Sequence, residues 1–89
     1  MAETDKEFNE DKVYVDVIVR FGKDGVVSPV SFVWEDGASY EIDRVLNVRR
    51  AASYRAGGNG ILFTCLVSGH KSRLYYEENN RWFMERRKN

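Results

Sequence analysis

Residues 13–42 read VYVDVIVRFGKDGVVSPVSFVWEDGASYEI, and this stretch decides the fold. Apolar and polar side chains alternate through its first strand, which is the period-two pattern of a β-strand with one buried face. Asp24–Gly25 then predicts a type I′ hairpin turn, because both central residues of that turn take a positive φ. The resulting register places Val17 opposite Phe32. Pro29 has no amide hydrogen, so the second strand is expected to be bulged or at an edge there.

The second turn, EDG, is predicted to be a three-residue loop in which Gly37 is left-handed. This loop length pairs Phe32 with Tyr40 and keeps the apolar faces matched. The next strand is expected to run from about residue 39 to residue 50. Its alternation slips at the apolar pair 45–46, where a bulge or bend would let the strand turn a barrel corner.

Three more strands are predicted from alternation at 61–68, 73–77 and 81–87, and the segment at 51–60 is expected to be a loop. Gly69–His70 is expected to form a tight turn, and a three-residue loop precedes the last strand. Twisted strands with one strongly apolar face tend to curl and close on themselves. The predicted fold class is therefore all-β, a small six-stranded antiparallel meander that closes into a barrel or roll.

One apolar face runs through all of these strands and is expected to form the core. Its members are Val15, Val17, Val19, Phe32, Trp34, Tyr40, Ile42, Phe63, Cys65, Leu74, Tyr76, Trp82 and Met84. In the registers that match these faces, Cys65 lies opposite Leu74 and Tyr76 opposite Trp82. A chain of 89 residues makes one domain, expected at residues 12–88, preceded by an acidic and disordered tail at 1–11.

Part of this region also resembles a known kind of protein. PVSFVWEDGASYEIDRV, residues 29–45, has the pattern P-x-x-F-x-W-x-x-G-x-x-Y-x-I-x-x-V. It is similar to the signature of a family of short, uncharacterised bacterial β-proteins in which such a hairpin leads into a basic strand end. The resemblance covers about a fifth of the chain. It implies a small β-barrel, no established activity and no particular functional residue.

The charges are unevenly distributed. The chain has 14 basic and 14 acidic residues, yet the segment 44–60, RVLNVRRAASYRAGGNG, contains no acid. Arginine binds phosphates bidentately, and small barrels bind single strands through basic grooves and aromatic platforms. The sequence therefore predicts a weak single-stranded nucleic-acid-binding module. Its candidate binding residues are Arg44, Arg49, Arg50, Tyr54 and Arg55, to which the C-terminal segment adds Arg81, Arg86, Arg87 and Lys88.

Two alternatives stay open. In the first, these arginines are only solvated and pair with neighbouring acids, which stabilises the fold little. In the second, the protein is a protein–protein interaction module or a structural homodimer. Apolar residues on the opposite strand faces would give a monomer an unusually large exposed patch. The expected interface residues are Tyr14, Ile18, Tyr75 and Phe83.

No enzymatic activity, metal site, cofactor or small-molecule substrate is predicted. His70 and Cys65 are the only residues of their kinds, and a metal site normally needs three or four ligands. Cys65 is expected to be an inert core residue. No apolar run approaches the ~20 residues that cross a bilayer, and the acidic N-terminus is unlike a secretory signal. A cytoplasmic protein without a membrane partner is therefore expected.

Overall fold

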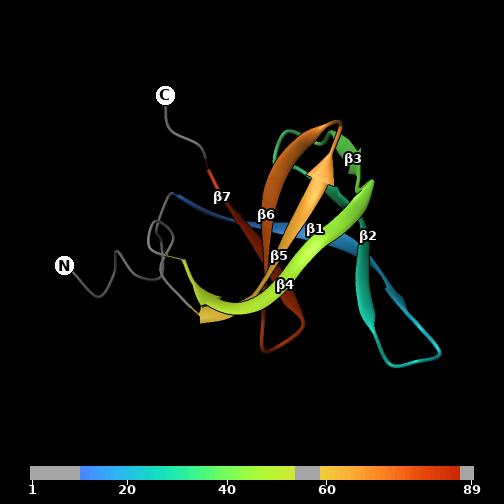
Figure 1. The fold of residues 1–89 in the computed structure, drawn as a ribbon. Helices are drawn as coiled ribbons and strands as arrows, with labels where there is room; N and C mark the ends of the chain where they lie inside the picture. The colour runs from blue at the N-terminus through green and yellow to red at the C-terminus, as the bar shows by residue number, and fades with distance from the viewer. Residues whose placement is uncertain (1–10, 54–58, 87–89) are drawn as a thin grey trace.

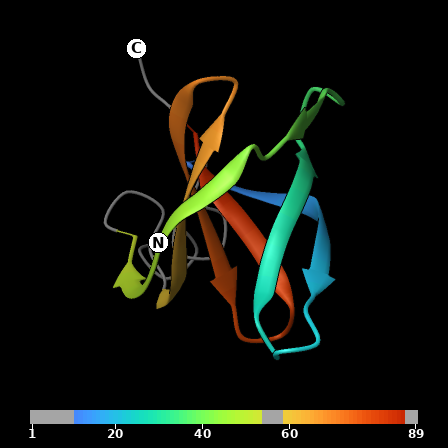
Figure 2. The same cartoon turned by 45° about the vertical axis from the view of Figure 1, so that its right-hand side comes forward.

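The computed structural model describes residues 11–53 and 59–86, which form a seven-stranded antiparallel sheet (Figure 1, Figure 2). The strands are β1 (Lys12–Phe21), β2 (Val27–Val33), β3 (Ser39–Glu41), β4 (Arg44–Ala52), β5 (Asn59–Val67), β6 (His70–Glu77) and β7 (Arg81–Glu85). Their order across the sheet is β3-β2-β1-β7-β6-β5-β4. The first and last strands of the chain therefore meet inside the sheet, and β3 and β4 are its edges. The described residues include no helix with the length and apolarity that a membrane span requires.

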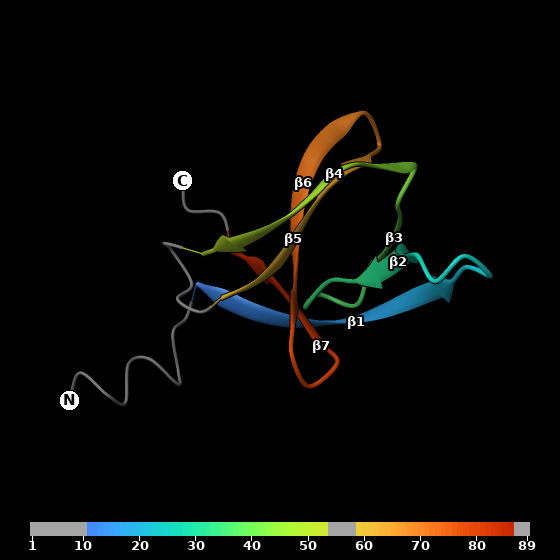
Figure 3. The same cartoon turned by 60° about the horizontal axis from the view of Figure 1, so that its bottom comes forward.

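The two halves of β1 belong to different parts of this sheet. Lys12–Val15 pair with β7, whereas Asp16–Phe21 pair with β2. Figure 3 shows the C-terminal half of β1 running on past the other strands toward its hairpin with β2. No local sequence signal predicted the pairing of β1 with β7. Because this pairing joins the first and last strands, the connectivity is largely, but not wholly, a meander.

A second corner lies in the link between β3 and β4. The amide of Ile42 donates to Val30 O of β2 at 2.8 Å, and the amide of Asp43 donates to Leu66 O of β5 at 2.8 Å. The predicted strand at 39–50 is thus divided in two by a bend, which gives seven strands where six were expected. The all-β antiparallel class is confirmed. The curled sheet is not closed into a barrel by hydrogen bonds between its edges.

The predicted slip in alternation at 45–46 is also confirmed. The β4–β5 register shifts between Val45 and Asn47, so Leu46 is the extra residue of a bulge. The bulge returns the following residues to their proper faces, because Val45 lies opposite Cys65 and Val48 opposite Phe63.

The first turn differs from its prediction. The amide of Gly22 donates to Val26 O at 2.8 Å, and Gly25 N donates to Gly22 O at 2.9 Å. Gly25 has a φ of 86°, but Asp24 has no positive φ. The turn is therefore a three-residue loop with a left-handed glycine, and the predicted type I′ turn was wrong.

The longer loop displaces the pairing by one residue, so that Val19 lies opposite Pro29. A bulge between Ile18 and Val19 then restores the predicted pairing of Val17 with Phe32. The irregularity expected at the proline is confirmed. It compensates for the one-residue displacement of the pairing that the longer loop causes.

The turn between β5 and β6 was placed one residue too late, which displaces the predicted pairing of the two strands by two residues. Ser68 and Gly69 have φ values of 50° and 80°, and Val67 lies opposite His70. The central residues are thus Ser68–Gly69, and Cys65 pairs with Ser72 where Leu74 was predicted. A displacement of two residues keeps every side chain on its expected face, because the side-chain period of a strand is two.

The core lies on the inner face of the curled sheet. Its buried members are Phe32, Phe63, Cys65, Val67, Leu74 and Trp82. The predicted core residues are in this cluster or packed against it, except Tyr40, which stacks on Phe32 but is 38 % exposed. The opposite side of the sheet is called the outer face below.

Candidate functional site

The basic residues of the sheet gather on β4–β6. Glu77 is the only acidic residue in these three strands. The register aligns their outer-face residues, because Arg44 lies opposite Leu66 and Leu66 opposite Lys71. Four exposed basic residues share this outer basic face: Arg44 and Arg49 of β4, and Lys71 and Arg73 of β6.

The predicted pair Arg49 and Arg50 is divided between the two faces. Arg49 lies opposite Leu62 on the outer face, whereas Arg50 lies opposite Ile61 on the inner face. Arg50 therefore cannot act on the same surface as Arg49 while β4 keeps its strand conformation. Tyr54 and Arg55, the other two predicted nucleic-acid-binding residues, lie outside the described residues.

The sequence analysis did not identify Lys71 and Arg73 as candidate binding residues. Their spacing could have indicated them, because two basic residues separated by one residue in a strand lie on the same face. Thr64 lies opposite Arg73, so the face continues without an acid from β4 across β5. Arg73 Nη2 also lies 3.7 Å from Glu85 Oε1 of β7. This acidic residue is the limit of the outer basic face on that side.

Next to these bases lies a second buried cluster, formed by Leu62, Tyr75 and Phe83. Tyr75 is 2 % exposed and Phe83 is 0 % exposed. Their rings stack in parallel, with centroids 4.8 Å apart. The prediction that Tyr75 and Phe83 form a surface for a second chain was therefore wrong about their exposure. Of the predicted interface residues, Tyr14 (41 %) and Ile18 (66 %) are exposed.

The side chain of Lys12 crosses this cluster. Its Nζ lies 4.6 Å from the centroid of the Phe83 ring and 2.7 Å from Glu77 Oε2. Tyr14 also donates to Glu77 Oε1 at 2.9 Å, and its ring meets Phe83 edge-on. A cation held above an aromatic face is favourable there. Lys12, Tyr14 and Glu77 thus cover Phe83 from within the same chain.

These contacts shift two pKa values. Burial opposes ionisation of Glu77, but its hydrogen bonds with Lys12 and Tyr14 outweigh that effect and lower the pKa of Glu77. Burial likewise opposes the charge of Lys12, and the hydrogen bonds with Glu77 and Tyr14 raise the pKa of Lys12. Both groups stay ionised around neutral pH, so Glu77 is already engaged and does not neutralise the outer basic face.

The C-terminal arginines have other contacts. Arg86 donates to both carboxylate oxygens of Glu35, at 2.7 Å and 3.0 Å. The guanidinium of Arg81 lies 3.8 Å from the centroid of the Tyr14 ring. Neither belongs to the outer basic face of β4–β6. Arg87 and Lys88 lie outside the described residues.

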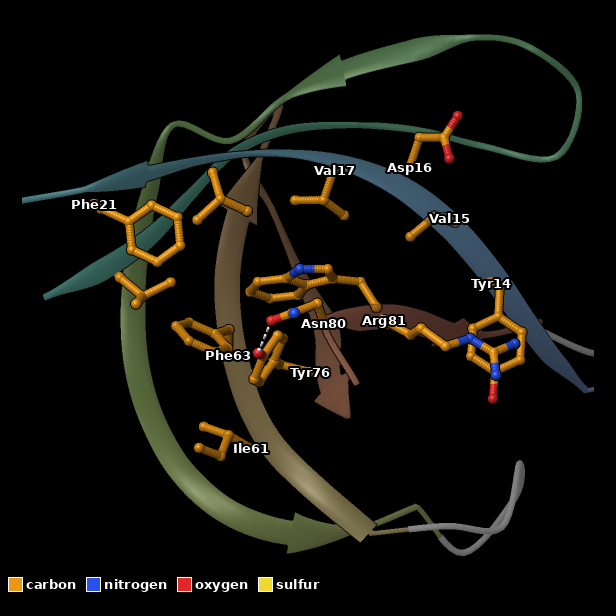
Figure 4. A pocket seen from close by; sticks show the side chains of 13 residues that line it. Tyr14, Val15, Asp16, Val17, Phe21, Ile61, Phe63, Tyr76, Asn80 and Arg81 are labelled. Carbon is orange, nitrogen blue, oxygen red and sulfur yellow. Dashed lines mark hydrogen bonds between the residues drawn. The ribbon is translucent and has the colours of Figure 1, made fainter. Parts of the chain in front are cut away.

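The inner face has an apolar groove of about 870 Å³ (Figure 4). It opens where β1 leaves β7, between the C-terminal half of β1 and the strands β5–β7. In Figure 4, Val17 points into the groove, Phe21 stands at one end, and Asp16 points away from it. Tyr76 hydrogen-bonds to Asn80 at 2.6 Å at the groove wall.

The two residues with the most reactive side chains lie apart. His70 is exposed at the start of β6, beside the turn. Cys65 is buried in the core, where desolvation raises the pKa of its thiol to about 11. A thiol with so high a pKa is a weak nucleophile at neutral pH. Within 11–53 and 59–86, no three His, Cys, Asp or Glu residues are grouped closely enough for a metal ion.

Comparison of the chain with models of known families, with curated proteins and with solved structures finds no match. The family resemblance of residues 29–45 therefore stays a prediction.

Proposed function

We propose that this protein is a non-catalytic binding module that binds single-stranded nucleic acid weakly on the outer basic face. The observation that carries the proposal is the placement of Arg44, Arg49, Lys71 and Arg73 on one face of adjacent strands that contain one engaged acid. Phosphate groups attract such bases at long range and release counterions when they bind.

The mode of binding differs from the one that the sequence suggested. Tyr75, the aromatic residue opposite Leu62 on this face, is buried and offers no surface on which a base can stack. The contacts that we expect are therefore with phosphates, which carry no sequence information. Binding is expected to depend on charge and length of the oligonucleotide and to be nearly independent of its sequence.

Fluorescence anisotropy with a labelled oligonucleotide tests this proposal. If four phosphates are neutralised, the logarithm of the affinity should fall with the logarithm of the salt concentration with a slope of about −3. Arg49→Gln should weaken binding and reduce that slope by about 0.7. Arg50→Gln is the matched control, because its side chain is on the inner face. Equal effects of the two substitutions, or no binding by folded protein at low salt, would refute the proposal.

Self-association is the second candidate function. The observation that favours it is the exposure of Ile18, which is 66 % accessible although it lies within a β-strand. A cytoplasmic location is proposed on the sequence alone.

A further inference from the structure

The C-terminal half of β1 has a free edge. Asp16–Phe21 pair with β2 on one side, and β7 accompanies β1 only as far as Val15. In the described part of the chain, no strand pairs with the other side of Asp16–Phe21. The two most exposed large apolar residues of that part are Phe21, 76 % exposed, and Ile18, and both lie on this segment. Such an edge exposes unpaired backbone donors and acceptors beside apolar side chains, which favours the addition of another strand.

The edge strand β4 is built differently. It carries Arg44, Arg49 and Arg50 and has a bulge at Leu46. Charged residues and bulges are the features that prevent an edge from pairing with another chain. The residues from Val17 to Val19 carry no charge, and the bulge beside them has its extra residue, Val30, in β2 and not in β1. The free edge of β1 is therefore the better site for strand addition.

We propose that this free edge pairs with the same edge of a second copy of the chain, antiparallel and centred on Ile18. A two-fold axis at Ile18 places Asp16 of each copy opposite Arg20 of the other, on the outer face. It also places the Ile18 side chains opposite each other and each Val17 opposite the other copy's Val19. Opposite charges and apolar side chains at directly opposed positions stabilise an antiparallel pair.

The groove provides the inner-face half of this interface. Val17 and Val19 line it, together with Phe63 and Trp82 from the other wall. A second copy of β1 would therefore bring its own valines against an apolar surface that the monomer leaves accessible. One pairing thus covers the groove, Ile18 and Phe21, and its symmetry makes both copies equivalent.

Analytical ultracentrifugation of the full chain, from micromolar to near-millimolar concentration, tests this dimer. Asp16→Arg alone and Arg20→Asp alone should each weaken association about tenfold, because both symmetry-related pairs become repulsive. The double variant Asp16→Arg with Arg20→Asp should restore it to within about threefold, since the charges are only exchanged. Ile18→Lys should give a monomer. Val48→Lys, on the exposed edge strand β4, is the matched control and should leave the dimer unchanged.

Near-ultraviolet circular dichroism of each variant establishes that it is folded. A wild-type chain that stays monomeric throughout, including one whose groove binds the dye anilinonaphthalene sulfonate, would overturn the proposal. The proposal would also be overturned if neither single charge substitution weakened dimerisation, or if the double variant did not restore it. None of these residues is in the outer basic face. Failure of nucleic-acid binding would therefore leave the association equilibrium unchanged, and the two proposals can fail separately.

Discussion

The two halves of β1 have the same alternation of apolar and polar residues but different neighbours. In Lys12–Val15 the inner-face residue Val13 is buried, and on the outer face Tyr14 contacts Phe83. In Asp16–Phe21 the outer-face residue Ile18 and the inner-face residue Phe21 are the most exposed large apolar residues described. The difference follows from the partner strand. The first half is paired with the last strand of the chain, and the second half is paired only with its own hairpin partner.

Alternation in the sequence thus indicates the face of the sheet on which a residue lies, whereas the pairing of strands distant in sequence determines whether that face is covered. Phe83 and Ile18 were both predicted to lie on the second apolar face, and both do. Phe83 is covered by Lys12, Tyr14 and Tyr75. The described residues offer Ile18 no such cover, so the sequence pattern could not separate a core residue from a surface one.

The largest effect is expected when a covered residue is compared with an exposed one. Phe83→Ala should lower the free energy of unfolding by about 3–5 kcal/mol, because it leaves a cavity beside Tyr75. Ile18→Ala should change it by less than about 0.5 kcal/mol, as surface substitutions usually do. Urea denaturation of the two variants, at a protein concentration where ultracentrifugation shows the chain to be monomeric, measures both values. Similar losses would show that the halves of β1 are equally buried in solution.

A smaller effect should follow removal of the charge that holds Lys12 above Phe83. Glu77→Gln should cost about 1.5–3 kcal/mol at neutral pH, the usual range for hydrogen bonds to charged groups. Because the pKa of Glu77 is lowered, its contribution is present above the ordinary glutamate value of 4.5 and is lost as the pH falls through its folded value. The raised pKa of Lys12 keeps that contribution until the pH rises beyond 10.5.

Urea denaturation of wild type and Glu77→Gln at several pH values checks this window. Their difference in stability should be constant near neutrality and should shrink in acid. Glu78→Gln, a substitution of the exposed neighbour in the turn, is the control and should match wild type throughout. A difference that persists unchanged below the folded pKa of Glu77 would contradict the electrostatic account of this cover.

The smallest effect is expected at the pair that joins the end of β7 to the β2–β3 loop. Glu35→Gln should leave the melting temperature unchanged within error, although Arg86 lowers the pKa of Glu35 through their hydrogen bonds. Exposed ion pairs are screened by water and contribute little. A clear fall in melting temperature would instead show that this contact helps to hold β1 between β2 and β7.

Much of the fold could be predicted from local patterns. The strand faces, the left-handed Gly37 and the pairing of Phe32 with Tyr40 follow from alternation and turn chemistry. At the turn between β5 and β6 the prediction failed because alternation fits two pairings equally well, since a pairing displaced by two residues leaves all faces unchanged. The pairing of β1 with β7 joins the two ends of the chain and leaves no local signal.

The candidate site was harder to predict than the fold. A run of bases in the sequence placed Arg49 and Arg50 together, but a strand sends neighbours to opposite faces. Lys71 and Arg73 join Arg44 and Arg49 only through the registers of β5 with its two neighbours. A surface assembled across three strands is visible in sequence only after every register is known.

The central claim is that the outer face of β4–β6, and not the inner groove, binds nucleic acid. Titration of the ¹⁵N-labelled protein with an unlabelled single-stranded oligonucleotide at low salt tests it most directly by amide chemical-shift mapping. We expect the largest shifts around Arg44, Arg49, Lys71 and Arg73, all reversed by added salt. Shifts centred on Val17 and the groove, or no shifts at all, would contradict it.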